Sequence, residues 1–296
     1  MTLLEHMYEL RYRLMVAVVA VLVGAIFGFV WWDIHPFGLP SLQELLTGPY
    51  CEIPDTRSGG PRVVFDPNHP CQLMATTPFE IILTRLTIGV TVGAVVFSPV
   101  WLYQLWAFIT PALYSKEKKF ALIFVAFASV LFVAGAYLAY WVVPIALKTL
   151  LGLGGGGYAV QLTGDKYISF IINMLVIFGV SFELPLLVVM LNRIGVLSYK
   201  RLASWRRGII MLLWIFAAFV TPGSDAVSMI VLAVVLTLLF EISIQISRLH
   251  DRGKARQLVT DGLITLDEAE ERFGMRPKIS TKKQAKAIDK PYDDAT

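Results

Sequence analysis

The stretch "FALIFVAFASVLFVAGAYLAYWVV", residues 120–143, contains no charged side chain. An apolar run of this length is enough to cross the roughly 30 Å hydrocarbon core of a membrane as one helix. Five further runs are also predominantly apolar, and together the six cover residues 14–32, 81–106, 120–143, 167–191, 208–220 and 226–246. Lipid offers no partner to open backbone groups, so each run is predicted to be a helix. The sequence therefore predicts an all-α polytopic membrane protein with six transmembrane helices.

The composition points the same way, since 56% of the 296 residues are hydrophobic and 16% are charged. A single soluble core of this size rarely shows that balance. The first apolar run is too long for the h-region of a signal peptide and continues into "WWDIHPF", residues 31–37, with no small-residue cleavage site. It is therefore expected to remain as a membrane anchor.

Lysine and arginine gather on one side of the predicted topology. The opposite side carries few of them, namely Arg57, Arg62, Lys148 and Lys166. The positive-inside rule then places both termini in the cytoplasm, in agreement with an even number of helices. The net charge of +4 reflects this bias, so nucleic-acid binding is not predicted.

The last two predicted helices are short. Run 208–220 would span about 20 Å, less than the hydrocarbon thickness, and this mismatch is expected to thin the bilayer locally. After about residue 250 the chain becomes polar and charged. The sequence therefore predicts a six-helix domain over residues 1–249 and a mostly disordered tail over 250–296, with "LITLDEAEERF", residues 263–273, as one possible short helix.

The two cysteines, Cys51 and Cys71, both fall in the first outside loop. An oxidising compartment would let them form a disulfide, which on the chain-entropy model stabilises the loop by roughly 3 kcal/mol. The alternative is two unpaired thiols. A zinc site is disfavoured because only His69 lies nearby and a closed site needs four ligands.

Sequence motifs of membrane enzymes are absent. No HExxH, GxSxG or Walker pattern occurs, and all four histidines lie outside the predicted spans. We therefore expect a protein that is not an enzyme and that needs neither cofactor nor metal.

Several polar residues need an account. Glu9 and Arg13 have the spacing of an ordinary surface pair on a helix. Arg85, near the outer end of its run, is expected to extend toward the interface. Glu183 is harder to explain, because it lies within "VSFELPLLVVM", residues 180–190, where an ionised carboxylate facing lipid costs on the order of 3 kcal/mol. It is expected to face protein or water, or to be protonated, with Asn173 as the other deep polar residue of its helix.

Four separated motifs resemble the TatC family, the multispanning subunit of the bacterial twin-arginine protein translocase. They are "HMYELRYRL" (6–14), "SPVWLYQLWAFITPALYSKEKK" (98–119), "FGVSFELPL" (178–186) and "TPGSD" (221–225). The resemblance runs from about residue 6 to 248 and preserves the order of the motifs. Two departures are the extra residue in "TPGSD", where the family commonly has "TPPD", and Met229 in place of a glutamine.

The resemblance implies a function. Family members recognise signal peptides with paired arginines and move folded proteins across the cytoplasmic membrane with the proton-motive force. The implied partners are TatA-like and TatB-like single-span subunits in a hetero-oligomer, the signal peptides and membrane lipid. By the same resemblance, the signal-binding surface comprises Glu9, Arg11, Phe108 and Glu117, while Glu183 and Asp225 are polar residues that contact partners.

Two other functions remain open at this stage. One is a proton-coupled small-molecule transporter with Glu183 as the proton carrier. That reading expects several intramembrane polar groups in related halves of the chain, whereas only Glu183 and Asn173 lie deep and no internal repeat is evident. The other is a scaffold without transport activity.

Overall fold

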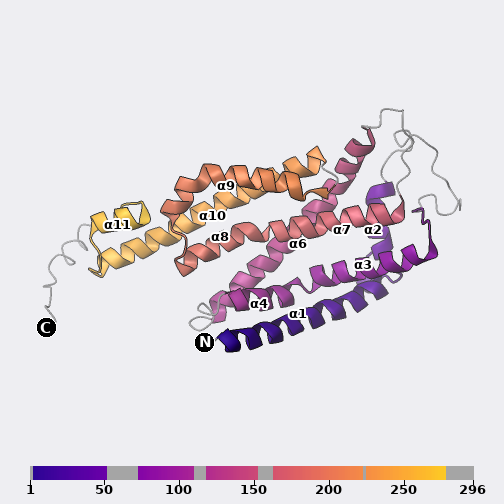
Figure 1. The fold of residues 1–296 in the computed structure, drawn as a ribbon, viewed down its shortest axis with the longest axis horizontal. Helices are drawn as coiled ribbons and strands as arrows, with labels where there is room; N and C mark the ends of the chain where they lie inside the picture. Colours follow the sequence, from indigo (N-terminus) through magenta and orange to yellow (C-terminus); the bar gives the residue numbers. More distant parts are fainter. Residues whose placement is uncertain (1–2, 52–72, 110–117, 153–162, 223–224, 278–296) are drawn as a thin grey trace. The chain divides into compact units, whose positions relative to one another are not determined.

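The computed structural model describes residues 3–51, 73–109, 118–152, 163–222 and 225–277 (Figure 1). The chain divides into two compact units, one of residues 1–183 with 217–232 and one of residues 184–216 with 233–296. Six helices among the described residues are long and apolar enough to cross a membrane: His6–Trp31, Pro78–Val96, Leu122–Gly152, Gly164–Ile194, Tyr199–Val220 and Ala226–Thr260. The prediction of six helical spans is confirmed.

The first unit contains α1 (Leu3–Trp31), a 3-10 turn (Pro36–Gly38), α2 (Leu42–Cys51), α3 (Pro78–Val96), α4 (Ser98–Ile109), α6 (Lys118–Gly152) and α7 (Gly164–Ser181). The remaining helices are α8 (Glu183–Ile194), α9 (Tyr199–Val220), α10 (Ala226–Thr260) and α11 (Leu266–Phe273). Apart from one isolated bridge between Met74 and Thr163, the described residues form no strand. In the first unit α1 lies along α3 and α4, while α6 contacts α4 and α7 (Figure 1).

Two pairs of glycines bring α1 and α3 into backbone contact. A Cβ atom added to Gly24 would lie 2.6 Å from the Cα of Gly93, and one added to Gly28 would lie 2.8 Å from the carbonyl oxygen of Gly89. Both helices thus carry two glycines four residues apart, the small-residue pattern that lets membrane helices approach closely. Any side chain at these positions would push the two helices apart.

The second and fourth spans are each interrupted once, which the sequence analysis did not predict. The second breaks at Phe97, two residues before Pro99, and the fourth at Phe182, three residues before Pro185. Proline has no N–H to continue the helical ladder and clashes with the preceding turn. At the first break the indole N–H of Trp101 donates to the carbonyl oxygen of Ala94 over 2.8 Å, so a side chain replaces a lost backbone partner.

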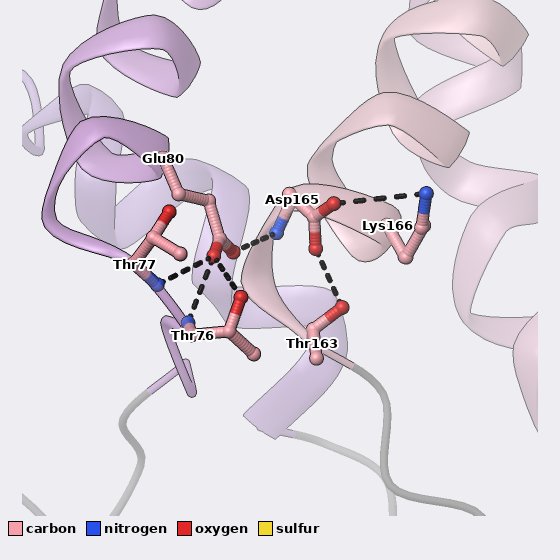
Figure 2. A network of polar contacts seen from close by, with 6 residues as sticks. All are labelled: Thr76, Thr77, Glu80, Thr163, Asp165 and Lys166. Carbon is pink, nitrogen blue, oxygen red and sulfur yellow. Dashed lines mark hydrogen bonds and ion pairs between the residues drawn. The ribbon is translucent and has the colours of Figure 1, made fainter.

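We call the end of the first unit where α1 stops and α3 and α7 begin the distal end, and the other the proximal end. At the distal end Glu80 joins two helices (Figure 2). Its Oε2 accepts hydrogen bonds from the N–H and Oγ1 of Thr76 over 2.8 Å each, which closes the start of α3. Its Oε1 accepts from the N–H of Asp165 in the first turn of α7 over 3.2 Å. One carboxylate therefore caps the free N–H groups of two helices.

Arg85, which was expected to extend toward the interface, forms an ion pair there. Its Nη1 and Nη2 each lie 3.2 Å from an oxygen of Asp33, and its guanidinium lies 5.4 Å from the centroid of the Trp32 ring. Asp33 lies two residues after the end of α1, so this fork-like pair ties the end of α1 to α3. A cavity of about 350 Å³ opens beside Arg85, Glu80 and Asp165, whose charged groups are already engaged.

The last two spans are longer as helices than as apolar runs. α9 has 22 residues and begins at Tyr199, before the apolar run 208–220, and α10 has 35 residues. The expectation of two short helices therefore holds for the apolar run of α9 but not for the helices themselves. The start of α9 is fixed by Asp251 of α10, whose Oδ2 accepts the N–H of Tyr199 over 2.8 Å and whose Oδ1 accepts from the amide of Asn192 over 3.1 Å.

The expected boundary at residues 249 and 250 falls inside α10, which continues unbroken to Thr260. The helix expected around residues 263–273 exists as α11. It packs Ala269 and Phe273 against Ala255 and Val259, and all four side chains are buried. The described part of the polar segment is therefore ordered and mostly helical, with non-helical residues at 261–265 and 274–277, and the expected disorder of residues 278–296 lies outside the described residues.

Candidate functional site

The proximal end of α1 holds an acid and an arginine in direct contact. Arg13 donates to Oε1 of Glu9 from Nε over 3.0 Å and from Nη2 over 2.6 Å. Both side chains are about three-quarters buried, with exposures of 21% for Arg13 and 25% for Glu9. A pair one helical turn apart forms readily, and partial burial reduces the screening of its charges. Glu9 is thus already shaped to accept a guanidinium.

An aromatic stack lies beside this pair and joins α1 to α4. The rings of His6 and Phe108 lie 4.5 Å apart between centroids, at an interplanar angle of 15°. His6, Glu9 and Arg13 follow each other at spacings of three and four residues, so they share one face of α1. Phe108 therefore lies next to the face that carries Glu9. His6 was not among the residues predicted for this surface, although its spacing from Glu9 is visible in the sequence.

The other predicted members of this surface have different outcomes. Arg11 is exposed, and two residues from Glu9 it projects from another side of α1. Glu117 lies outside the described residues, so its closeness to Glu9 stays a prediction. The proposed disulfide stays a prediction for the same reason, since Cys71 also lies outside them.

The break in the fourth span explains where Glu183 lies. Glu183 is the first residue of α8, directly after the interruption at Phe182, and both of its carboxyl oxygens are shielded from solvent. The side chain that interacts with its carboxyl is Trp106 of α4. Trp106 is itself 3% exposed and packs edge-on against Phe124 of α6 at 4.9 Å. Glu183 therefore faces protein, as the sequence analysis expected.

One short segment of α4 contacts both Glu183 and the site around Glu9. Trp106 interacts with the carboxyl of Glu183, and Phe108, two residues later, stacks on His6. Asn173 does not join Glu183, because it is exposed on α7 about ten residues and roughly 15 Å earlier along the span. Sequence reasoning missed Trp106, because the closeness of α4 to the fourth span is a tertiary feature.

Asp225 has a structural contact. It is buried at 3% exposure, and its Oδ1 accepts the N–H of Ser228 over 2.6 Å at the start of α10. Asp is a favoured residue for this capping position. A role in contacting partners stays a prediction. Among the described residues, no group of three or more His, Cys, Asp or Glu could hold a metal ion.

The six helical spans among the described residues define a multispanning membrane protein, and comparison with known proteins agrees. A family model described as Sec-independent protein translocase protein (TatC) matches residues 5–234. The chain belongs to the TatC family. As a six-span member it is a protein of the bacterial cytoplasmic membrane.

Individual relatives show the extent of the similarity. The chain is 40% identical over 279 residues to a Sec-independent protein translocase protein TatC of Corynebacterium kroppenstedtii, covering 91% of this chain and 66% of that protein. It is 35% identical over 257 residues to the protein of the same name of Aquifex aeolicus, covering 98% of the latter. A crystal structure described as the twin arginine translocase receptor TatC in DDM matches with a TM-score of 0.63 and 34% identity, over 82% of this chain and 99% of that one.

Proposed function

We propose that this chain is the receptor subunit that binds twin-arginine signal peptides at the proximal end of its first unit. It then takes part in moving the folded proteins that carry these signals across the cytoplasmic membrane, driven by the proton-motive force. Both termini lie in the cytoplasm, as the distribution of lysine and arginine predicts, so the site faces its substrates. TatA-like and TatB-like single-span subunits complete a hetero-oligomer.

The contact between Glu9 and Arg13 carries this proposal. Glu9 accepts two donors of one guanidinium on Oε1, so the site binds an arginine even when no ligand is present. A guanidinium offers five donors in a planar fork, whereas a lysine ammonium offers a point charge. A signal arginine can therefore replace Arg13 and make the same bonds. Glu117, which lies between α4 and α6 in the sequence, is proposed to take the second arginine.

Phe108 supports the choice of arginine over lysine. Guanidinium groups stack on aromatic faces as well as binding carboxylates. The stack of His6 on Phe108 places such faces beside Glu9, and both rings are partly exposed. The guanidinium of a ligand arginine can thus donate hydrogen bonds from its edge to Glu9 and stack its planar face on an aromatic ring.

Transport in inverted membrane vesicles tests the proposal. Vesicles that contain this chain together with TatA-like and TatB-like subunits should take up a folded reporter with a twin-arginine signal. They should take up little of the same reporter with a twin-lysine signal, and an uncoupler should stop uptake. The Glu9→Gln variant should reduce uptake strongly, while Glu270→Gln, an exposed acid on α11, should not. Equal uptake of the reporters with the twin-arginine and the twin-lysine signal would contradict the proposal.

No observation in the described residues favours the alternative of a small-molecule transporter. That function needs several polar groups along a path through the spans. Glu183 faces Trp106, and the other deep polar residue of its span, Asn173, does not lie beside it. The signal receptor is therefore the function that the geometry supports best.

A further inference from the structure

An exposed stripe runs along most of α9, over residues 201–215 in the second unit. Arg201, Trp205, Gly208, Leu212 and Ile215 follow each other at alternating spacings of four and three residues, so they line one face of the helix. Trp205 is 66% exposed and Leu212 is 62% exposed. The stripe begins with a cation, continues with an indole, and ends on aliphatic side chains.

The cation at the head of the stripe is not engaged by its neighbours. Within the second unit, Lys200 donates to the carbonyl oxygen of Glu271 over 2.7 Å, and Arg206 binds Glu241 over 2.5 Å. No hydrogen bond or ion pair of the Arg201 or Arg207 side chain occurs among the described residues. Two exposed guanidinium groups therefore lie before the apolar run on different sides of α9, and the one on the stripe, Arg201, is free to bind an anion.

Gly208 leaves a gap in the stripe where the polar turns meet the apolar ones. A Cβ atom added there would meet nothing within 4 Å, so the space beside the helix is open. It lies between Trp205 and Leu212. A slender chain can therefore pass close to the backbone at this point.

We propose that this stripe is a binding site for one anionic phospholipid. The phosphate binds Arg201, and the Trp205 indole N–H meets the ester region. The acyl chain runs over Gly208 and along Leu212 and Ile215.

The order and spacing of the side chains favour a lipid over a protein helix. Along the axis Trp205 lies about 6 Å, and Leu212 roughly 16 Å, from Arg201. One leaflet places its phosphate, ester and acyl regions in this order, and half of a roughly 30 Å hydrocarbon core is about 15 Å. Tryptophan favours the interface, and basic residues attract anionic headgroups there. A partner helix has no need of this sequence of groups.

Lipid retention by the full chain tests the proposal. The chain is purified in a neutral detergent, mixed with phosphatidylglycerol or phosphatidylcholine, and examined by native mass spectrometry. Wild type should retain phosphatidylglycerol in preference. Arg201→Gln should lower that retention about fivefold and leave phosphatidylcholine unchanged. The matched control is Arg252→Gln, which removes an exposed charge of α10 about 18 Å beyond Phe240 and should behave as wild type.

A second variant tests the path of the acyl chain without changing charge. Gly208→Leu fills the gap and should also lower phosphatidylglycerol retention, with helix content by circular dichroism unchanged. Inorganic phosphate at the same concentration should not displace the lipid. The proposal is overturned if Arg201→Gln and Arg252→Gln behave alike, or if inorganic phosphate competes fully, which would mark a simple anion site. A photocrosslinker at position 212 that captures a protein helix instead of lipid would overturn it as well.

Discussion

Arg13 donates two hydrogen bonds to a single oxygen of Glu9, one from Nε over 3.0 Å and one from Nη2 over 2.6 Å. The chain thus supplies its own arginine to the carboxylate that we propose binds a signal arginine. When no signal peptide is bound, the guanidinium of Arg13 compensates the negative charge of Glu9 and holds its side chain in place. A signal peptide must displace Arg13, so the internal pair competes with the ligand.

Removing the competitor should therefore strengthen signal binding. Helical pairs at this spacing contribute about 0.3 to 0.5 kcal/mol, so Arg13→Gln should tighten binding of a twin-arginine signal about twofold. Arg11→Gln removes the same charge without releasing Glu9, and is the matched control. Affinities measured with a fluorescent signal peptide on detergent-solubilised protein decide the matter. If Arg13→Gln binds the signal more weakly than Arg11→Gln does, Arg13 assists binding and the competition model fails.

The contact between α1 and α3 should be intolerant of a single added methyl group. Gly93→Ala places a Cβ 2.5 Å from the backbone nitrogen of Ala25, where no flexible side chain can yield. Overpacking of this kind costs about 1 to 3 kcal/mol, so thermal unfolding in detergent should shift to a lower temperature. Gly208→Ala meets open space and should be neutral or slightly stabilising, since alanine favours helix. Equal unfolding temperatures for the two variants would show that the close crossing is absent.

Acid should loosen α11. The N–H of Thr265 donates to Oε2 of Glu268 over 2.7 Å, and this backbone hydrogen bond, helped by the Thr265 side chain, lowers the pKa of Glu268 from its ordinary value of 4.5. Because the folded state prefers the ionised form, the contribution of this cap is complete above that value and is lost as the pH falls through the lowered pKa.

Hydrogen exchange of residues 266–273 measures this effect. After correction for intrinsic exchange, protection should fall between about pH 5 and about pH 3 in wild type. Glu268→Gln cannot titrate, so it should show less protection at neutral pH and little further loss on acidification. Glu270→Gln, a neighbouring exposed acid, should follow wild type. An identical pH profile for Glu268→Gln and wild type would exclude the cap as the cause.

Glu183 should matter for transport and not for signal binding. It begins α8 with both oxygens shielded from solvent, and its carboxyl interacts with Trp106 and not with the pair of Glu9 and Arg13. Glu183→Gln keeps a group that can hydrogen-bond within the protein, whereas Glu183→Ala leaves the break without one. We expect Gln to retain much of the vesicle transport and Ala to lose most of it, while both crosslink to signal peptides normally. Full transport by Glu183→Ala would show that transport does not depend on the Glu183 side chain.

Much of the fold was predictable because lipid imposes one requirement on every span. Apolar runs locate all six helices, since no other structure satisfies an isolated segment's backbone in lipid. The ends were less predictable, because residues 199–207 of α9 are polar yet helical, and their start depends on Asp251 more than fifty positions away. Pro99 and Pro185 are visible in the sequence and explain the two breaks. A proline in a membrane helix does not always break it, however, so the breaks could not be predicted from these residues alone.

The candidate site was predictable in part for a similar reason. The spacing of Glu9 and Arg13 gives their contact, because both lie on one helix. The stack of His6 on Phe108 joins residues about a hundred positions apart, and the neighbour of Glu183 comes from another span. Such contacts follow from how helices pack, which also depends on the glycine pairs of α1 and α3. Periodicity within one helix does not reveal them.

A double-mutant cycle between Glu9 and the arginine pair of the signal tests the central claim most directly. Binding is measured for wild type and Glu9→Gln, each with a twin-arginine and a twin-lysine signal. A direct charged hydrogen bond predicts a coupling of about 1 to 3 kcal/mol: Glu9→Gln loses roughly tenfold with twin arginine and little with twin lysine. If the two substitutions are additive, so that Glu9→Gln weakens both signals by the same factor, Glu9 does not bind the signal arginine.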